Sequence, residues 1–242
     1  MVKQKQKLII LLIITYLKEK HKMISIKNIS KTYNKKKVLN KIDLEINQGE
    51  IVSIVGPSGA GKTTLLNIMS TLDKPDDNIN SKLTIDNIDV VNLNDNKLSK
   101  FRNTQIGFIF QFHELLPEFS AIENVIIPAI IKGENKKIST IKAKKILDSL
   151  GLSKVINQQP SQLSGGEQQR VAVARALINN PKIIFADEPS GNLDSKSSEL
   201  LHKLFFDLRK KHNITFVIVT HNKDLSDMTD RKLNLVDGKW AE

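Results

Sequence analysis

Hydrophobic and polar residues alternate near the start of the chain in the manner of half-buried strands. The alternation runs from residue 24 to 30 and again from 38 to 46, with a polar turn around Asn34 to Lys37 between the two stretches. A period of two predicts a pair of strands, each with one buried face. The next apolar stretch, Ile51 to Val55, is continuous, which indicates a strand buried on both faces.

Helical and extended patterns then follow one another to the end of the chain. Strand 51–55 runs into a glycine-rich loop, after which we expect a helix over Thr63 to Thr71 and a short strand at Leu83 to Ile85. From about Phe101 to Asn180 the pattern is helical. The later expected elements are strand 183–186, helix 196–211, strand 215–219, a short helix near 222–228 and strand 233–236. This order predicts an α/β fold: a mainly parallel core sheet flanked by helices, an N-terminal antiparallel β part, and an inserted helical subdomain at about 101–180.

Several helix boundaries in the helical region have specific signals. Ser120-Ala121-Ile122-Glu123 is a capping box, and Ser164 to Glu167 is a second one at the start of a helix that we expect to reach Ile178. Gly151 ends the helix expected over 138–150, because glycine adopts the left-handed conformation easily. We expect Pro128 to bend the helix that contains it.

Composition narrows the range of partners. The 242-residue chain has no cysteine, 37 Lys and Arg residues against 26 Asp and Glu, and a net charge of +11. The lack of cysteine excludes a disulfide framework and a Cys-based zinc site. The charge suggests an anionic partner, but lysine greatly outnumbers arginine, which is the residue that reads bases and phosphates in two-point contacts. We therefore expect no nucleic-acid partner.

Residues 1–22 form an N-terminal extension whose role the sequence leaves open. Its apolar part, Leu8 to Ile14, is far shorter than the ~20 residues that a membrane-spanning helix needs. A basic start and a short apolar run resemble a signal peptide, but Lys18-Glu19-Lys20-His21-Lys22 stands where small residues should mark cleavage. We expect that Met23 is the true start and that residues 1–22 are misassigned or disordered. The alternative is a short amphipathic segment on the membrane surface.

The glycine-rich loop between strand 51–55 and helix 63–71 has the features of a phosphate-binding loop. Its glycines let backbone N–H groups approach phosphates, and the helix N-terminus favours negative charge. We expect Lys62 to bridge the β- and γ-phosphates of a nucleotide and the Thr63 hydroxyl to ligate Mg²⁺. The strand–loop–helix context argues against a chance glycine turn. The expected ATP-binding residues are Gly56, Pro57, Ser58, Gly59, Ala60, Gly61, Lys62, Thr63 and Thr64.

An apolar strand ends in two adjacent carboxylates, Asp187 and Glu188. Neighbouring strand residues point to opposite faces, but the chain turns at Pro189, so both side chains can reach a site at the end of the strand. We expect Asp187 to hold Mg²⁺ through water and Glu188 to polarise the water that attacks the γ-phosphate. The plainer interpretation is that these are two solvated carboxylates at a loop edge. The phosphate-binding loop upstream favours a catalytic role instead.

A second glycine turn, Ser164-Gly165-Gly166, enters a helix. Such a helix N-terminus binds anions, so a chain that already has one phosphate-binding loop could use this turn for the γ-phosphate of a nucleotide held by another subunit. Taken alone, the turn favours the plainer interpretation of a helix cap without a further role.

Together these motifs resemble the ATP-binding subunits of ABC transporters, from about Met23 to the C-terminus. The resemblance rests on the phosphate-binding loop, Gln111, Leu163-Ser164-Gly165-Gly166-Glu167-Gln168, Asp187-Glu188, Ser190-Gly191-Asn192-Leu193-Asp194 and His221. It implies a P-loop NTPase of the ABC type that hydrolyses ATP with Mg²⁺. It also implies a head-to-tail homodimer with two ATP molecules sandwiched between the subunits.

The resemblance implies roles for single residues as well. Ser164, Gly165 and Gly166 would contact the ATP bound by the partner chain, and Asp194 would communicate between the two sites. Gln111 would contact Mg²⁺ and link the site to a membrane subunit, and His221 would contact the γ-phosphate. Tyr33 stands where the family has its adenine-stacking aromatic residue, although a lone tyrosine is more often a half-buried strand residue. The expected catalytic residues are Lys62, Gln111, Glu188 and His221.

Two stretches are similar to the lipoprotein-releasing branch of the family. Gly107 to Val125 closely resembles it, and Gly191-Asn192 is shared with macrolide-efflux and cell-division relatives. This branch implies membrane subunits with periplasmic domains, a lipoprotein cargo, and a peripheral location on the cytoplasmic face of the inner membrane. The alternative is the ATPase of a macrolide-efflux-type exporter or of the cell-division ABC complex.

Other ABC-type ATPases fit the sequence less well. DNA-repair and chromosome ATPases need a long coiled-coil insertion or Cys-based zinc modules, and translation factors carry two ATP domains in one chain; this sequence has none of these. One departure from the family is Asn87, which stands where a turn glycine is common. Asparagine tolerates the left-handed conformation nearly as well, so this departure concerns local geometry rather than activity.

Overall fold

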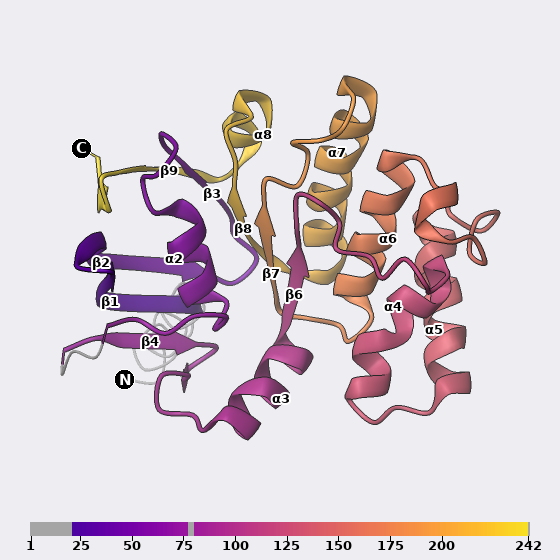
Figure 1. The fold of residues 1–242 in the computed structure, drawn as a ribbon, viewed down its shortest axis with the longest axis horizontal. Helices are drawn as coiled ribbons and strands as arrows, with labels where there is room; N and C mark the ends of the chain where they lie inside the picture. The colour runs from indigo at the N-terminus through magenta and orange to yellow at the C-terminus, as the bar shows by residue number, and fades with distance from the viewer. Residues whose placement is uncertain (1–20, 77–79, 242) are drawn as a thin grey trace, which may run out of the picture.

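The computed structural model describes residues 21–76 and 80–241. Of the expected N-terminal extension, residues 1–20 therefore lie outside the described residues. The described chain forms two sheets with helices packed around them (Figure 1). This architecture confirms the expected α/β fold.

The N-terminal sheet has four antiparallel strands in the order β2-β1-β4-β5. They are β1 (Lys22–Tyr33), β2 (Lys36–Asn47), β4 (Lys82–Ile85) and β5 (Ile88–Asp89). Asn34 and Lys35 between β1 and β2 have φ angles of 47° and 67°, which is the left-handed pair of a tight hairpin turn. Asn87 has a φ of 62° in the β4–β5 turn, so asparagine supplies the left-handed conformation there.

The core sheet has six strands in the order β10-β9-β3-β8-β7-β6. They are β3 (Ile51–Val55), β6 (Ile106–Ile109), β7 (Ile183–Asp187), β8 (Thr215–Val219), β9 (Arg231–Val236) and β10 (Lys239–Trp240). All neighbours are parallel except β10, which is antiparallel to β9. Because parallel strands end at one edge of a sheet, the loops after β3, β7 and β8 meet at that edge.

Helices follow several of these strands and form a separate group beside β6. α2 (Lys62–Met69) follows β3, and α3 (Asp95–Gln105) precedes β6. The helices α4 (Ala121–Ile131), α5 (Lys136–Ser149) and α6 (Gly165–Leu177) lie together on the right of Figure 1. A 3₁₀ turn (Pro160–Gln162) lies between α5 and α6. The last two helices of the described residues are α7 (Ser195–His212) and α8 (Lys223–Met228). Both expected capping boxes are present, and Gly151 follows α5 with a φ of 72°.

The core sheet separates two hydrophobic cores. Along β7, Ile183 and Phe185 pack with residues of α2 and the N-terminal sheet, whereas Ile184 and Ala186 pack with residues of α4 to α7. Alternate residues of one strand thus enter different cores, which is why the strand needs a continuous apolar sequence.

The expectation of helix from about Phe101 to Asn180 needs a correction. Ile106–Ile109 is strand β6, paired in parallel with β7, and the helix before it begins at Asp95. Four apolar residues do not distinguish a short buried strand from a piece of helix. Gly107 pairs with Ile184 in this strand, and a Cβ at Gly107 would lie 2.9 Å from the Ala176 carbonyl oxygen, so glycine lets α6 pack closely on β6. The hydrophobic pattern also does not predict the two-residue strand β10.

Candidate nucleotide-binding site

The loop between β3 and α2 has a backbone that its glycines make possible. Gly56, Gly59 and Gly61 have φ angles of 148°, 79° and 99°, all in the range that glycine adopts without strain. At Gly56 a Cβ would also collide with the Leu235 carbonyl oxygen of β9, and at Gly61 it would lie 2.9 Å from the Val38 carbonyl oxygen. Close packing against two neighbouring strands therefore excludes a side chain at these two positions.

Lys62 places a positive charge inside this loop. Its Nζ atom donates to the carbonyl oxygens of Gly56 at 2.8 Å and Pro57 at 2.9 Å. The ammonium group and the N-terminus of α2 together make the loop attractive to phosphate. Val38 of β2, Ser58 and Thr64 line the same hollow, and so does Asp187 at the end of β7.

Thr63 and Asp187 bring two oxygen ligands together. The Thr63 hydroxyl donates to Asp187 Oδ1 at 3.5 Å. Burial raises the pKa of Asp187, and the charge of Glu188 raises it further, against the opposing effects of Thr63 and Lys62. Hydroxyl and carboxylate oxygens are the ligands that Mg²⁺ prefers, and a bound cation would stabilise the charged carboxylate. The pair therefore fits a magnesium ion that nucleotide phosphates would bind as well.

Glu188 and His221 form an ion pair or hydrogen bond beside this loop. Glu188 Oε1 lies 2.9 Å from His221 Nδ1, and the His221 backbone N–H donates to Glu188 Oε2 at 3.2 Å. The His221 side chain is 73% exposed and that of Glu188 17%. A carboxylate held by a histidine and open to one side is well placed to accept a proton from water.

Gln111 follows β6 and faces the loop after β7. Its Nε2 atom donates to Asn192 Oδ1 at 3.4 Å, and Asn192 Nδ2 donates back to the Gln111 carbonyl oxygen at 3.3 Å. Asp194 caps α7 by accepting from the backbone N–H and the hydroxyl of Ser197. Gln111 is thus linked to the Asn192 loop by its side chain.

Tyr33 lies at the end of β1 with its hydroxyl donating to Asp73. Lys31 Nζ bonds Asp73 at 2.8 Å and lies 4.9 Å from the centroid of the Tyr33 ring. The hydrogen bond to Asp73, with smaller effects of burial and of the Asp73 charge, raises the pKa of Tyr33 to about 12. Tyr33 is 43% exposed, so the ring is held in place yet open to a ligand.

Comparisons with known proteins identify the family of this chain. The sequence profile of the ABC transporter family matches residues 39–191. The lipoprotein-releasing system ATP-binding protein LolD of Bacteroides fragilis is 57% identical over 216 residues, which is 89% of this chain and 99% of the relative. The LolD protein of Cytophaga hutchinsonii is 57% identical over 211 residues, or 87% of this chain and 95% of the relative. The chain belongs to the LolD family of ABC transporter ATP-binding proteins.

Solved structures of ATP-binding cassettes share the fold. The dimeric post-hydrolysis state of the ATP-binding cassette MJ0796, bound to ADP and Pi, has a TM-score of 0.83 at 41% identity and covers 91% of this chain and 97% of that chain. CbiO1 from Clostridium perfringens, part of the ABC transporter complex cbiONQ, has a TM-score of 0.82 at 24% identity, over 92% and 88% of the two chains. The chain is an ABC-type ATPase that couples ATP hydrolysis to transport.

The second glycine turn of this ABC ATPase lies apart from its own phosphate-binding loop. Ser164 caps α6, and a Cβ added at Gly166 would lie 2.9 Å from Ser197 Oγ of α7. Ser164, Gly165 and Gly166 are absent from the lining of the hollow that contains Lys62. Within one chain, the structure therefore joins the phosphate-binding loop with Asp187, Glu188 and His221, and it leaves Ser164 to Gly166 outside this group.

Sequence reasoning missed two residues that hold the site together. Asp73 has no motif around it and fixes Tyr33 from the loop that follows α2. Asn192 belongs to a family motif in the sequence without a role of its own, yet it exchanges hydrogen bonds with Gln111. The Gly-Asn pair after the two carboxylates was the one available signal for such a contact.

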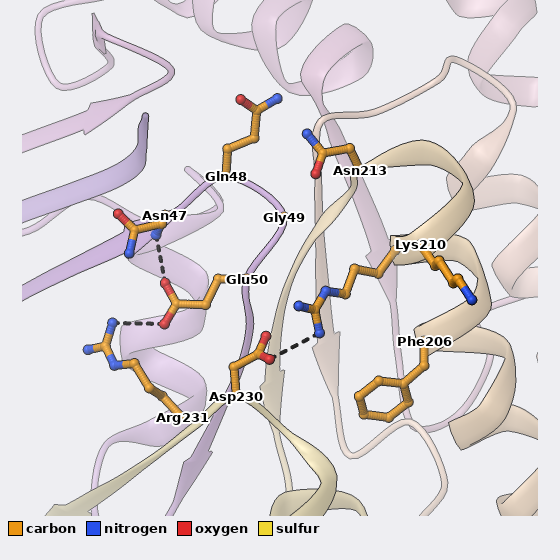
Figure 2. A pocket seen from close by; sticks show the side chains of 10 residues that line it. Asn47, Gln48, Gly49, Glu50, Phe206, Lys210, Asn213, Asp230 and Arg231 are labelled. Carbon is orange, nitrogen blue, oxygen red and sulfur yellow. Dashed lines mark hydrogen bonds and ion pairs between the residues drawn. The ribbon is translucent and has the colours of Figure 1, made fainter. Parts of the chain in front are cut away.

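A different hollow, of about 840 Å³, lies at the amino ends of the strands, away from the phosphate-binding loop. Arg209 lies 3.0 Å from Asp230, and Arg231 lies 3.0 Å from Glu50. Figure 2 shows the Arg231 side chain turned towards that of Glu50. The charges of this hollow are largely paired, and nucleotides bind at the carboxyl edge of such sheets. It is therefore not part of the ATP site.

Proposed function

We propose that this chain is the ATP-hydrolysing subunit of a membrane ABC complex that drives lipoprotein release from the inner membrane. The observation that carries the proposal is the likeness to LolD proteins over nearly their whole length, 57% identity across 99% of the Bacteroides fragilis protein. The hydrolytic part is supported by the Glu188–His221 pair beside the phosphate-binding loop.

The residues of one chain supply most of a hydrolysis site. Lys62 and the loop N–H groups would hold the β- and γ-phosphates, and Thr63 with Asp187 would hold Mg²⁺, which supplies charge neutralisation when bound. Glu188 accepts a proton from the attacking water, and His221, bonded to it, orients the carboxylate towards the γ-phosphate. Gln111 is proposed to contact the same cation.

We propose that the missing part of the site comes from a second copy of the chain. Ser164, Gly165 and Gly166 form the N-terminus of α6, a turn whose N–H groups can bind phosphate. They would contact the ATP held by the partner, with Asp194 communicating between the two sites. The dimeric state of the 41%-identical cassette MJ0796 supports this arrangement.

We place the chain on the cytoplasmic face of the inner membrane, attached to integral membrane subunits that have periplasmic domains. In residues 21–76 and 80–241, no helix has the length and apolar character to cross a membrane. Exposed apolar side chains follow Gln111 directly: Phe112 is 71%, Leu116 43% and Phe119 41% exposed. Apolar groups at such exposure suit a contact with a membrane subunit, so a movement there would reach Gln111.

Trapping the ATP-bound state tests the function as a whole. Glu188→Gln keeps the shape of the side chain but removes the base, so hydrolysis should fall at least a hundredfold while ATP binding persists. The tagged full-length variant, purified from native membranes with ATP, should retain membrane subunits with large periplasmic domains together with acylated lipoproteins. Recovery of a division-type membrane partner or an efflux subunit would reject lipoprotein release, and normal hydrolysis would remove Glu188 from the mechanism.

A further inference from the structure

The backbone at Glu188 is strained. Its φ angle is 45°, a left-handed value that side chains with a Cβ rarely adopt. Such a conformation persists only where the surroundings fix it. Two backbone bonds contribute: the Glu188 N–H donates to the Val219 carbonyl at 2.9 Å, and the Gly191 N–H donates to the Glu188 carbonyl at 3.0 Å.

A buried side chain from another element holds the next residue. Gln169, on α6, is 1% exposed, and its Nε2 atom donates to the Pro189 carbonyl oxygen at 2.7 Å. The same nitrogen lies 3.5 Å from the carbonyl oxygen of Phe110, the residue before Gln111. Because only the NH₂ group of an amide can donate, two carbonyl neighbours fix its orientation. One amide thus touches both the loop after Glu188 and the segment of Gln111.

This arrangement has an energetic cost. Within the described part of the chain, Gln169 Oε1 is buried without a hydrogen-bond partner. A buried, unpaired oxygen destabilises the fold, and an apolar side chain would avoid that loss only by giving up both contacts with the loops. The two contacts with the loops, rather than packing alone, account for an amide at this position.

We propose that Gln169 is a positioning residue for ATP hydrolysis, which holds the backbone after Glu188 and ties it to the segment of Gln111. The proposal rests on the catalytic role of Glu188 proposed above. His202 of α7 supports the same loop from the other side, with Nε2 3.2 Å from Ser190 Oγ. A shift at Phe110 is passed through one amide to Pro189, and so to the carboxylate that activates water.

Replacing the amide by a thioether tests the proposal. Gln169→Met keeps the length and burial of the side chain but removes the donor. In the full-length chain with Mg²⁺ and ATP, we expect kcat to fall about tenfold and KM for ATP to change less than about twofold, because no ATP-binding residue is touched. A kcat within about twofold of the parent value overturns the proposal. If the Met variant fails to fold, Gln169→Leu serves, since an aliphatic side chain has no donor either.

Asn179 offers a matched control. Its side-chain Nδ2 donates to the carbonyl oxygens of Asn103 at 2.9 Å and Pro128 at 3.1 Å, so it is also an amide between two carbonyls but touches no catalytic loop. Asn179→Leu should lower the melting temperature about as much as Gln169→Met and leave kcat unchanged. If both variants lose kcat in proportion to the decrease in their melting temperatures, Gln169 has only a structural role and the proposal fails.

A double-mutant cycle tests the link to Gln111. If Gln111 acts on Glu188 through Gln169, the kcat loss in Gln111→Ala combined with Gln169→Met is smaller than the product of the single losses. A loss equal to the product overturns the link. Glu188→Gln distinguishes failure of the proposed function from failure of this inference. If Glu188→Gln hydrolyses ATP normally, the proposed function has failed. If Glu188→Gln loses hydrolysis but Gln169→Met hydrolyses ATP normally, only this inference is rejected.

Discussion

The hydroxyl of Tyr33 and the carboxylate of Asp73 determine how the ring of Tyr33 is held. Asp73 is itself fixed by Lys31: burial raises the pKa of Asp73, but hydrogen bonds from Lys31 and Tyr33 outweigh that effect and lower it. The ring therefore has a charged anchor on its hydroxyl and a cation near its face, and it needs little ordering when a planar ligand stacks on it.

Removing the charge of Asp73 should release the phenol. In Asp73→Asn we expect the pKa of Tyr33 to fall from about 12 towards the ordinary value of 10.0, since the main cause of the rise is lost. Ultraviolet titration of the phenolate measures this directly in a Tyr16→Phe background, which leaves Tyr33 as the one tyrosine. Lys22→Met, which removes an exposed lysine paired with Glu45, should leave the titration unchanged; an unmoved Tyr33 curve in Asp73→Asn contradicts the contact.

His202 makes the fold less stable in acid. Burial lowers its pKa below 6.5, although Asp224 and Glu199 partly oppose this. The folded state therefore binds fewer protons than the unfolded one, so stability falls as the pH drops below about 6.5 and levels off once the folded pKa is passed. His113, whose pKa burial also lowers, adds to the same trend.

Urea unfolding between pH 7 and pH 5 measures this effect. His202→Gln can still bond Ser190 but does not titrate, so the decline in unfolding free energy should be smaller than in the parent chain. Equal pH slopes for His202→Gln and the parent chain would show that His202 does not cause the acid sensitivity.

Among the elements, the phosphate-binding loop depends most on what packs against it. Gly56 meets the Leu235 carbonyl of β9, while a Cβ at Gly59 would have nothing within 4 Å. We expect Gly56→Ala to lower the unfolding free energy by about 2–4 kcal/mol, against about 1 kcal/mol for Gly59→Ala, where only the positive φ is strained. Urea unfolding of both variants checks this; equal losses would mean that the contact with β9 adds nothing.

The predictability of the elements followed their length and pattern. The long alternating strands, the capping boxes at Ser120 and Ser164, and the loop at Gly56 could be predicted because each has a local physical cause. β6 could not, since four apolar residues acquire strand character only by pairing with β7. The contact of Gln169 with Pro189 joins residues 20 apart in the sequence, and no local pattern encodes it.

For the whole molecule, the start of the folded domain is a testable matter. β1 begins at Lys22, and His21 lies 2.8 Å from Asp86, which also pairs with Lys182. A chain that starts at Met23 keeps the Lys182–Asp86 pair and loses the His21–Asp86 and Lys22–Glu45 pairs. Ion pairs that solvent reaches are worth at most about 1 kcal/mol each. The shortened chain should fold and hydrolyse ATP like the full chain. Insolubility, or failure to join the membrane partner, would assign a function to residues 1–22.

The position of Gln169 on α6 has a consequence for an assembled pair of chains. The helix begins at the turn of Ser164, proposed to sense the partner's γ-phosphate, and Gln169 lies five positions later, about 7 Å along the axis. The N-terminus of α6 would then contact one ATP, and Gln169 would hold the backbone next to Glu188, the carboxylate that acts on the other ATP. ATP bound at one site should therefore control hydrolysis at the other site. The hydrolysis rate should then rise sigmoidally with ATP concentration, with a Hill coefficient approaching the number of sites. A Hill coefficient near one would mean that the helix no longer couples the two sites.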